Sequence, residues 1–259
     1  MPRIDLSAID TDDTDGLTEE RAQEELASLR ERLADLQDRL FAEEERALLI
    51  VLQGMDGSGK DHVISHLLSA CDPSGLRVHN FKKPAGEEAA HDFLWRFHQQ
   101  TPAKGMVQVF DRSHYEEVIF PRVHDLVGDE HWKARLDSIN DFERMLAREG
   151  TAIVKLLMHI SHEEQGERIR QRLERREKHA DFSAADVKER EHWDAYQRAF
   201  QDVLDATSND VARWHVIPAD HKWYVPVAAG RVVVAALEEI DPQYPELDRE
   251  EVEEAGVAD

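Results

Sequence analysis

Short apolar runs alternate along the chain with longer segments in which apolar residues recur every three or four positions. The short runs predict strands at Ala47–Gln53, Leu76–Phe81, Met106–Phe110, Ala152–Ile160 and Trp214–Ile217. The longer segments predict helices at Lys60–Ala70, Glu87–Gln99, a segment from Tyr115, Asp129–Glu149, Glu163–Arg175, Ala184–Ala206 and Trp223–Ile240. Such alternation is typical of an α/β fold, here a three-layer α/β/α domain with a five-stranded, mostly parallel sheet.

A further helix precedes the first strand. Thr18 can cap it, and its pattern continues to about Glu45. Its leucines alternate spacings of three and four and form one apolar stripe: Leu26, Leu29, Leu33, Leu36 and Leu40. The stripe could form a short coiled coil or an oligomer contact, but such stripes more often pack on the parent domain. We therefore predict an N-terminal helical extension that packs on the sheet domain.

Charge is distributed unevenly along the 259 residues. Fifty-five acidic residues against 32 basic ones give a net charge of −23, and both ends of the chain are acidic. We predict a disordered tail at 1–16, one domain at 17–245 with a lid at about 163–192, and an acidic tail at 246–259. This charge argues against general nucleic-acid binding. A site for a polyanion would have to be a local basic island.

Cysteine content and hydropathy point to a cytoplasmic protein. Cys71 is the single cysteine, which excludes an intramolecular disulfide framework. The first residues lack the apolar core of a signal peptide, and no apolar run is long enough to span a bilayer. We therefore expect a cytoplasmic location and no membrane partner.

The strongest motif follows the first predicted strand. Gly54 and the pair Gly59-Lys60 have the spacing of a phosphate-binding P-loop between a strand and a helix. Glycines at 54, 57 and 59 let the loop, including Ser58, turn its N–H groups toward phosphate oxygens. The helix N-terminus favours the same anion, and Lys60 adds a charge that can bridge reacting phosphates.

Two aspartates make this loop unusual. Asp61 stands where a P-loop usually has Ser or Thr, and Asp56 lies inside the loop. A carboxylate beside a phosphate is repulsive unless a cation lies between them, so the pair suggests Mg²⁺, or alternatively Mn²⁺, bridging carboxylate and phosphate. Asp61 can equally be a favourable charge at a helix N-terminus. For Asp56 the metal role is favoured.

A second motif, Asp-Arg-Ser-His-Tyr-Glu-Glu, follows the third predicted strand. If that strand neighbours the P-loop strand, Asp111 can hold Mg²⁺ or orient the acceptor phosphate, and Arg112 can stabilise charge on the transferred phosphoryl group. His114 and Tyr115 could line the acceptor pocket or could be a packed helix start. Arg122 could face the same pocket.

Basic residues gather at two further places. Lys82 and Lys83 follow the second predicted strand, where a ligand of a parallel sheet binds. After the fourth strand, helical spacing puts four arginines on one face: Arg168, Arg172, Arg175 and Arg176. They could bind phosphates from a lid or form salt bridges with the intervening glutamates.

Several stretches match one known family. They are Leu52–Asp61, Ala90–Arg96, Asp111–Val118, His159–Gln165 and Pro218–Trp223. Together they resemble the type 2 polyphosphate kinases, P-loop enzymes that move phosphate between inorganic polyphosphate and nucleotides. The likeness covers about residues 17–245. The Gly-Lys-Asp ending of the P-loop is the form found in that family.

The resemblance implies a P-loop kinase fold similar to thymidylate kinase, a lid, Mg²⁺ and phosphate transfer to AMP or ADP. By motif position it implies that Asp56, Lys60, Asp111 and Arg112 are the catalytic set. It further implies that Lys82, Lys83 and the lid arginines around Arg172 contact polyphosphate, and that a homodimer or homotetramer is plausible. The chain departs from the family at His62, where Gly is common, and at Ala180-Asp181, where Trp-Lys is common.

Two other functions stay open from the sequence. Asp-Arg after a strand is also compatible with an ATP-dependent nucleoside monophosphate kinase, although Asp61 speaks against it. A non-catalytic protein that binds polyphosphate or a nucleotide is the other alternative. The sequence does not distinguish AMP from ADP as the acceptor, adenine from other purine bases, or one direction of transfer from the other.

Overall fold

The computed structural model describes residues 3–174, 176 and 184–247. Within them one sheet contains five parallel strands in the order β2-β3-β1-β4-β5. The strands are β1 (Ala47–Gln53), β2 (Leu76–Asn80), β3 (Val107–Asp111), β4 (Thr151–His159) and β5 (Trp214–Pro218). Each predicted strand is confirmed to within one residue at either end, and the predicted α/β fold is confirmed.

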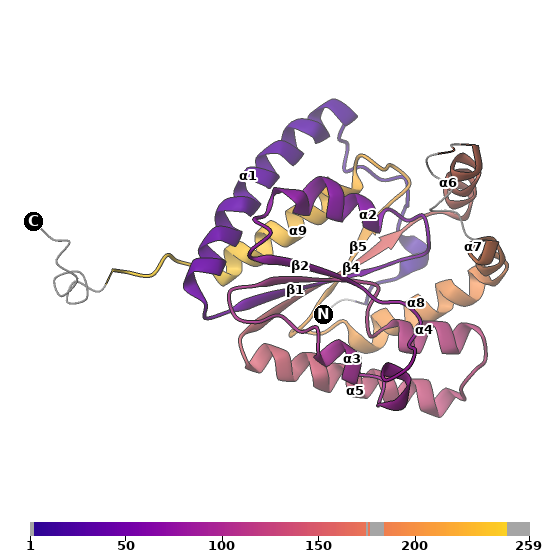
Figure 1. The fold of residues 1–259 in the computed structure, drawn as a ribbon. Helices are drawn as coiled ribbons and strands as arrows, with labels where there is room; N and C mark the ends of the chain where they lie inside the picture. Colours follow the sequence, from indigo (N-terminus) through magenta and orange to yellow (C-terminus); the bar gives the residue numbers. More distant parts are fainter. Residues whose placement is uncertain (1–2, 175, 177–183, 248–259) are drawn as a thin grey trace, which may run out of the picture.

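Helices cover both faces of the sheet (Figure 1). One layer holds α1 (Glu19–Glu43), α9 (Val225–Ile240) and the helix that begins with α2 (Lys60–His62). The other holds α3 (Trp95–His98), α4 (Glu116–Val123), α5 (Asp129–Arg148) and α8 (Trp193–Thr207). Beyond the carboxyl ends of the strands lie α6 (His162–Glu174) and α7 (Ala184–Glu189). This is the predicted three-layer arrangement.

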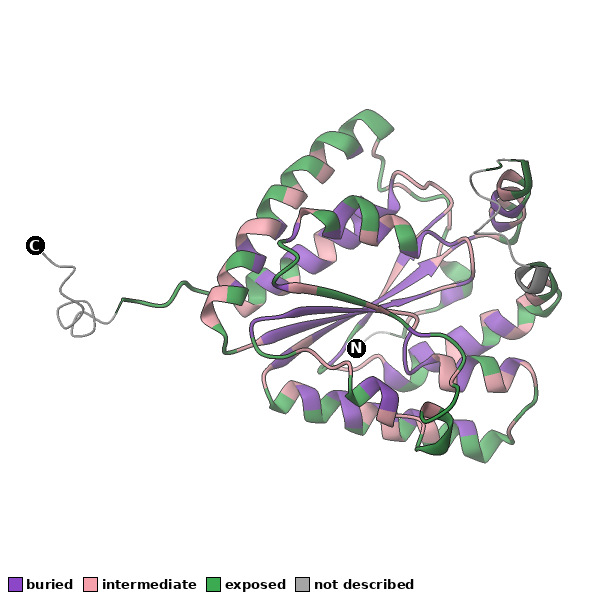
Figure 2. Ribbon diagram, viewed as in Figure 1, coloured by how far each residue is buried: buried purple, intermediate pink, exposed green. Residues whose placement is uncertain are grey.

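Strand β1 forms the centre of the core. All seven of its residues are buried, because β3 and β4 flank it and helices cover both of its faces (Figure 2). A strand buried on both faces is a continuous apolar run, which explains why the sequence located it without error. Strand β2 lies at the edge of the sheet and is largely exposed. The P-loop thus follows the most rigidly packed strand.

The leucine stripe of α1 packs on its own domain. Leu33, Leu36 and Leu40 are buried, and α1 lies along α9. Gly230 of α9 permits this approach, since a Cβ there would lie 3.1 Å from Leu29 Cδ1. The packing that the sequence favoured is confirmed.

Three predicted helices are less regular than expected. The segment 60–70 changes to a π-helix, η2 (Val63–Leu67), and a 3-10 turn, η3 (Leu68–Ala70). The segment 87–99 contains η4 (Glu88–Ala90) and α3, separated where the Asp92 carboxylate accepts from the Leu94 amide at 2.9 Å. The segment 184–206 is interrupted by the 3-10 turn η6 (Arg190–His192). Side-chain caps and changes of helix type leave the apolar period intact, so the sequence did not reveal them.

The predicted disorder of the N-terminal tail is wrong for residues 3–16. Leu6, in the 3-10 turn η1 (Leu6–Ala8), is buried, and its amide donates to Gln201 Oε1 at 2.8 Å. The Thr11 hydroxyl donates to the Asp220 carboxylate at 2.8 Å. One buried leucine and side-chain hydrogen bonds anchor the segment, and such contacts produce no periodic pattern. Of the predicted acidic tail at 246–259, the structure describes residues 246 and 247.

Within the described residues, none of the helices combines the length and the hydropathy needed to cross a membrane.

The packing of α1 on α9 predicts the effect of Leu33→Ala. Leu33 is buried without exposed surface, so its truncation leaves a cavity and should lower the free energy of unfolding by about 3 kcal/mol. Ser28 lies on the exposed side of the same helix, and Ser28→Ala should change it by less than about 0.5 kcal/mol. Urea unfolding of both variants measures the difference. Equal effects would contradict the packing described for α1.

Candidate active site

The loop between β1 and α2 has the conformation of a phosphate-binding loop. Gly54, Gly57 and Gly59 have φ values of 142°, 83° and 99°, which other residues rarely adopt. Lys60 is 8% exposed, and its ammonium group donates to the carbonyls of Gly54 at 2.8 Å and Met55 at 3.1 Å. The lysine side chain therefore lies across the loop, and its positive charge would act on an anion bound there.

A cleft of about 410 Å³ opens at the carboxyl ends of the strands. Its walls come from the P-loop, the ends of β2 and β3, helix α6 and the loop between β5 and α9. The predicted site residues in its lining are Asp56, Gly57, Gly59, Lys60, Asp61, Asp111, Arg112, Arg168 and Arg172. The parallel pairing of β1 with β3 brings the two main motifs together, as the sequence predicts.

Arg112 and Asp56 form an ion pair at the centre of this region. Arg112 Nη2 lies 2.6 Å from Asp56 Oδ1. Burial opposes ionisation of Asp56, but the charges of Lys60 and Arg112 outweigh burial and hold the pKa of its carboxyl below the usual value. Burial likewise opposes the charge of Arg112, but the Asp56 and Glu116 carboxylates raise its pKa further. Both groups are therefore charged at neutral pH.

The backbone at Arg112 is strained. Its φ of 60° lies in the left-handed region, which costs a residue with a side chain about 1–2 kcal/mol. Strain of this kind persists only where surrounding contacts fix the chain, and it is concentrated at functional sites. The turn directs the guanidinium to a point where three hollows meet, since Arg112 lines the P-loop cleft and two smaller hollows.

Comparison with known proteins identifies the family. The family description Polyphosphate kinase 2 (PPK2) matches residues 16–245. The chain belongs to the polyphosphate kinase 2 family. It is therefore a phosphotransferase with a P-loop kinase-like α/β fold, and the resemblance seen in the sequence is confirmed.

Individual relatives are similar over nearly their whole length. The AMP/ADP-polyphosphate phosphotransferase of Meiothermus ruber is 43% identical over 246 residues, covering 94% of this chain and 92% of that protein. The ADP-polyphosphate phosphotransferase of Rhodopseudomonas palustris is 39% identical, covering 88% and 83%. The crystal structure of polyphosphate kinase 2 from Arthrobacter aurescens TC1 is 41% identical, with a TM-score of 0.93 over 98% of this chain and 92% of that one.

The second hollow lies between the P-loop, α4 and α8 and has a volume of about 190 Å³. It is lined by Gly54, Met55, Asp56, Arg112, Glu116, Ile119, Phe120, Glu189, Tyr196 and Phe200. Burial raises the pKa of Glu116 above its usual value, against the opposing effect of the Arg112 charge. This hollow has aromatic walls, whereas the cleft on the other side of Arg112 has more basic side chains than carboxyl groups.

Lys82 and Lys83 line the third hollow and not the P-loop cleft. Both are exposed, and the carbonyl of Lys82 accepts from Arg96 Nη1 at 2.6 Å. Arg112 also lines this hollow, so the lysines adjoin the cleft through the arginine.

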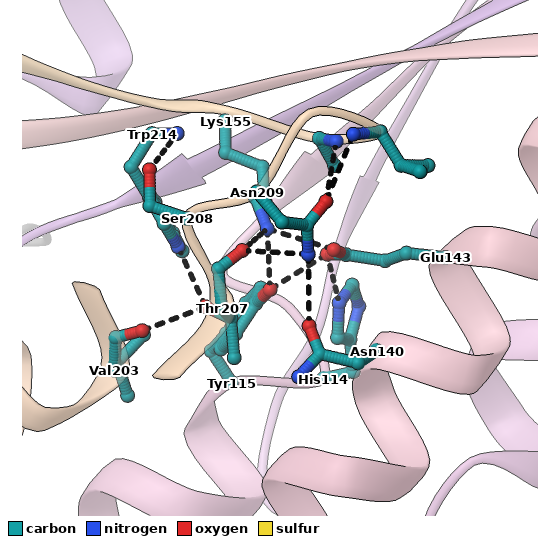
Figure 3. A network of polar contacts seen from close by, with 12 residues as sticks. His114, Tyr115, Asn140, Glu143, Lys155, Val203, Thr207, Ser208, Asn209 and Trp214 are labelled. Carbon is teal, nitrogen blue, oxygen red and sulfur yellow. Dashed lines mark hydrogen bonds and ion pairs between the residues drawn. The ribbon is translucent and has the colours of Figure 1, made fainter. Parts of the chain in front are cut away.

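Three predicted positions need correction. His114 and Tyr115 are fully buried, bond to Glu143 and line none of these hollows (Figure 3). Of the two roles that the sequence left open for them, the packed helix start holds and the acceptor pocket does not. Arg122 pairs with Asp202 and stacks on the Trp132 ring, so it faces α8 and α5. The prediction for Ser58 concerned its amide, which donates to the Met55 carbonyl at 3.1 Å, and its side chain is buried under the loop. Sequence spacing gave the order of these residues but not the direction of their side chains.

The arginines of α6 divide into two kinds. Arg168 is 3% exposed and donates to the carbonyls of Gly57 at 2.8 Å, Ala219 at 2.6 Å and Asp220 at 2.9 Å. Its Nε also pairs with the Glu164 carboxylate at 2.7 Å, one of the salt bridges with intervening glutamates that the sequence allowed. Arg168 therefore ties α6 to the P-loop and is not a free lid cation. Arg172 lines the cleft, and its charge helps to lower the pKa of Asp56 after the larger effects described above. Arg175 and the variant positions Ala180 and Asp181 lie outside the described residues.

Some lining residues were not predicted. Asn80 donates to the Asp111 carboxylate at 2.5 Å, and Lys222, Gln171 and His62 complete the cleft. Asn80 lies two residues before Lys82, and Lys222 lies inside Pro218–Trp223, one of the stretches that match the family. Their position at the ends of β2 and β5 was the available signal, because ligands bind at that edge of a parallel sheet.

The close approach of the P-loop to β4 predicts that Gly54→Ala strongly destabilises the protein. A Cβ at Gly54 would lie 2.6 Å from the carbonyl oxygen of Met158, in a conformation that disfavours any side chain. We expect the free energy of unfolding to fall by about 3 kcal/mol or more. At Gly86 φ is also positive but the space is open, so Gly86→Ala should cost only about 1 kcal/mol. Chemical denaturation compares them, and similar losses would contradict a close approach at Gly54.

Buried His114 predicts a dependence of stability on pH. Burial lowers the pKa of His114 in the folded protein, whereas the unfolded chain takes up the proton near pH 6.5. Stability should therefore fall as the pH decreases below 6.5, and one such histidine accounts for at most about 1.4 kcal/mol between pH 7.5 and 5.5. His114→Gln should reduce this fall by up to that amount. Denaturant unfolding at both pH values measures it, and an unchanged difference would refute the assignment.

Proposed function

We propose that this protein transfers phosphate between inorganic polyphosphate and a nucleoside mono- or diphosphate, AMP to ADP, ADP to ATP, or both, reversibly. One observation carries the proposal: a P-loop cleft lined by Lys60, Arg112, Arg168, Arg172 and Lys222 in a protein of net charge −23. Such a basic island suits a linear polyanion. Membership of the polyphosphate kinase 2 family and the names of the relatives point to the same substrates.

The two sides of Arg112 suggest how the substrates divide. Polyphosphate occupies the P-loop cleft and extends along the α6 arginines, with Lys82 and Lys83 continuing the basic path past Arg112. The acceptor nucleotide, an adenine or another purine nucleotide, enters from the hollow between α4 and α8. Its aromatic side chains suit a base, and its polar end lies at Arg112. The segment at about 163–192 acts as a lid.

In the proposed reaction a terminal phosphate oxygen of the acceptor attacks the terminal phosphorus of polyphosphate in line. The new P–O bond forms as the bond to the bridging oxygen of the chain breaks, and the chain leaves one phosphate shorter. Lys60, the loop amides and Arg112 stabilise the charge that develops.

Asp56, Asp61 and Asp111 would hold Mg²⁺, or alternatively Mn²⁺. All three line the cleft, and Asp56 is held in its charged form. Within the described residues, no three acidic, histidine or cysteine side chains come close enough to form a complete metal cage. One or two of these carboxylates, together with substrate phosphates, would then hold the ion, as is usual for magnesium in proteins. When bound, the ion supplies neutralisation of phosphate charge.

Other features of the proposal follow from charge and family. The strong negative charge opposes association with nucleic acids and with anionic membranes. We infer a cytoplasmic protein that assembles as a homodimer or homotetramer.

A two-acceptor assay tests the function. Protein incubated with polyphosphate, Mg²⁺ and either AMP or ADP should form ADP or ATP. Lys60→Ala should reduce the rate at least about 100-fold, because it removes a charge that stabilises the transition state. Lys104, exposed and away from the cleft lining, provides the control Lys104→Ala, which should keep full activity.

Each other outcome identifies a different function. Absence of product with both acceptors, from protein shown to be folded, would refute the proposal. Product formed from ATP and AMP without polyphosphate would favour a nucleoside monophosphate kinase. Binding of polyphosphate without turnover would favour a non-catalytic protein.

A further inference from the structure

A cluster of charged and polar side chains lies in the core, around the segment that follows Arg112 in the sequence. The proposed reaction uses none of them. Lys155 of β4 and Glu143 of α5 have 0% and 1% of their side chains exposed and form an ion pair of 2.7 Å. Tyr115 and His114, both fully buried, complete the cluster (Figure 3). A buried ion pair is seldom the most stable way to fill a core, because desolvation offsets its attraction. The cluster therefore calls for a role beyond packing.

Every donor of Lys155 is used. Its ammonium group donates to Glu143 Oε2 at 2.7 Å, to the Tyr115 hydroxyl at 2.8 Å and to the carbonyl of Thr207 at 2.8 Å (Figure 3). An ammonium group has three donors, so this geometry leaves it no freedom to rotate to other partners. The hydroxyl of Tyr115 is thus held from one side by β4.

Glu143 holds the same segment from the other side. Its Oε1 accepts from the Tyr115 hydroxyl at 2.7 Å and from His114 Nε2 at 3.2 Å. Burial opposes its ionisation, but the charge of Lys155 and the hydrogen bond from His114 keep the pKa of Glu143 below its usual value. The hydroxyl of Tyr115 bridges the two members of the ion pair, accepting from one and donating to the other.

These residues immediately follow the strained turn. Arg112 has φ 60°, Ser113 is bonded to Gln53 of β1 at 2.9 Å, and His114 and Tyr115 are bonded to α5 and β4. Helix α4 begins at the next residue, Glu116. The chain that leaves Arg112 is therefore anchored to β1, β4 and α5 within three residues. Directional hydrogen bonds can fix such a turn in a way that apolar packing cannot.

We propose that Tyr115, Glu143 and Lys155 form a positioning network that fixes the backbone turn at Arg112 and so directs its guanidinium toward the transferred phosphate. The inference rests on the proposed function for the identity of that phosphate. None of the three residues touches the cleft, so each acts through Arg112 and Glu116. Binding of polyphosphate in the cleft also uses Lys60, Arg168, Arg172 and Lys222, so it should change much less than the rate of transfer.

Tyr115→Phe is the test with the least disturbance. It removes the bridging hydroxyl but keeps the ring, whose centroid lies 4.9 Å from that of Trp214, and it leaves the Lys155–Glu143 pair in place. We expect kcat to fall about tenfold while KM for polyphosphate stays within about twofold. Val233→Ala, at a buried position of α9 on the opposite face of the sheet, is the control. It should lower the melting temperature and leave kcat unchanged.

A double-mutant cycle with Arg112→Lys separates positioning from general stability. If the network acts through Arg112, Tyr115→Phe should reduce kcat by less than about twofold in the Arg112→Lys background. If Tyr115 merely stabilises the fold, the two losses should multiply. Multiplying losses, or a parallel increase in KM for polyphosphate, would overturn the proposal.

Hydrogen exchange tests the same idea without turnover. Amides of residues 112–116 should exchange at least about tenfold faster in Tyr115→Phe than in the unaltered protein, and those of Val233→Ala should not. Equal exchange in all three proteins would overturn the positioning role. If the unaltered protein transferred no phosphate, the proposed function would fail, and this comparison would still decide whether the network holds the turn.

Discussion

The site depends on the register between β1 and β3. Leu52 lies opposite Asp111, and the Arg112 amide donates to the Leu52 carbonyl at 3.2 Å, so both strands end at the same level. A slip of two residues would keep the apolar faces buried but move Arg112 by roughly 7 Å along the strand. The ion pair with Asp56, at 2.6 Å, could not then form. Burial of β1 alone therefore does not select the register, which is set by the pairing of β1 with β3 and β4.

Hydrogen bonds to neutral carbonyl groups orient two of the positive charges of the cleft. Lys60 and Arg168 both donate to carbonyl oxygens of the P-loop, and Arg168 also donates to the loop after β5. Carbonyl oxygens orient a cation without cancelling its charge, and carboxylates offset only part of the set, with Glu164 paired to Arg168 and Asp56 to Arg112. A highly acidic chain can thus keep a basic cleft. Charges held in this way need little rearrangement when an anion reacts, which is the arrangement that favours phosphoryl transfer.

The sequence predicted the sheet, the P-loop and, if β1 and β3 are neighbours, the position of Arg112 beside that loop, because each depends on a local pattern or on the rule that parallel strands end at one edge. The ion pair between Asp56 and Arg112 is a finding of the structure. The sequence did not separate His114 and Tyr115, which turn into the core, from Arg112, which turns out of it. That difference is set by the positive φ of Arg112, and an arginine in the sequence does not predict a positive φ. Lys155 was equally hidden, since its strand is otherwise apolar and its partner Glu143 lies on a helix with ordinary amphipathic spacing.

The left-handed turn at Arg112 and the buried charges after it are best understood together. A glycine would adopt this φ at lower cost, but it would carry no guanidinium to the junction of the three hollows. Arginine at this position therefore requires a surrounding structure that opposes relaxation of the turn. Apolar side chains could fill the same volume, yet they would tolerate small rotations of the segment. The Tyr115 hydroxyl accepts from Lys155 and donates to Glu143, and these bonds oppose such rotations because their strength falls steeply with distance and angle.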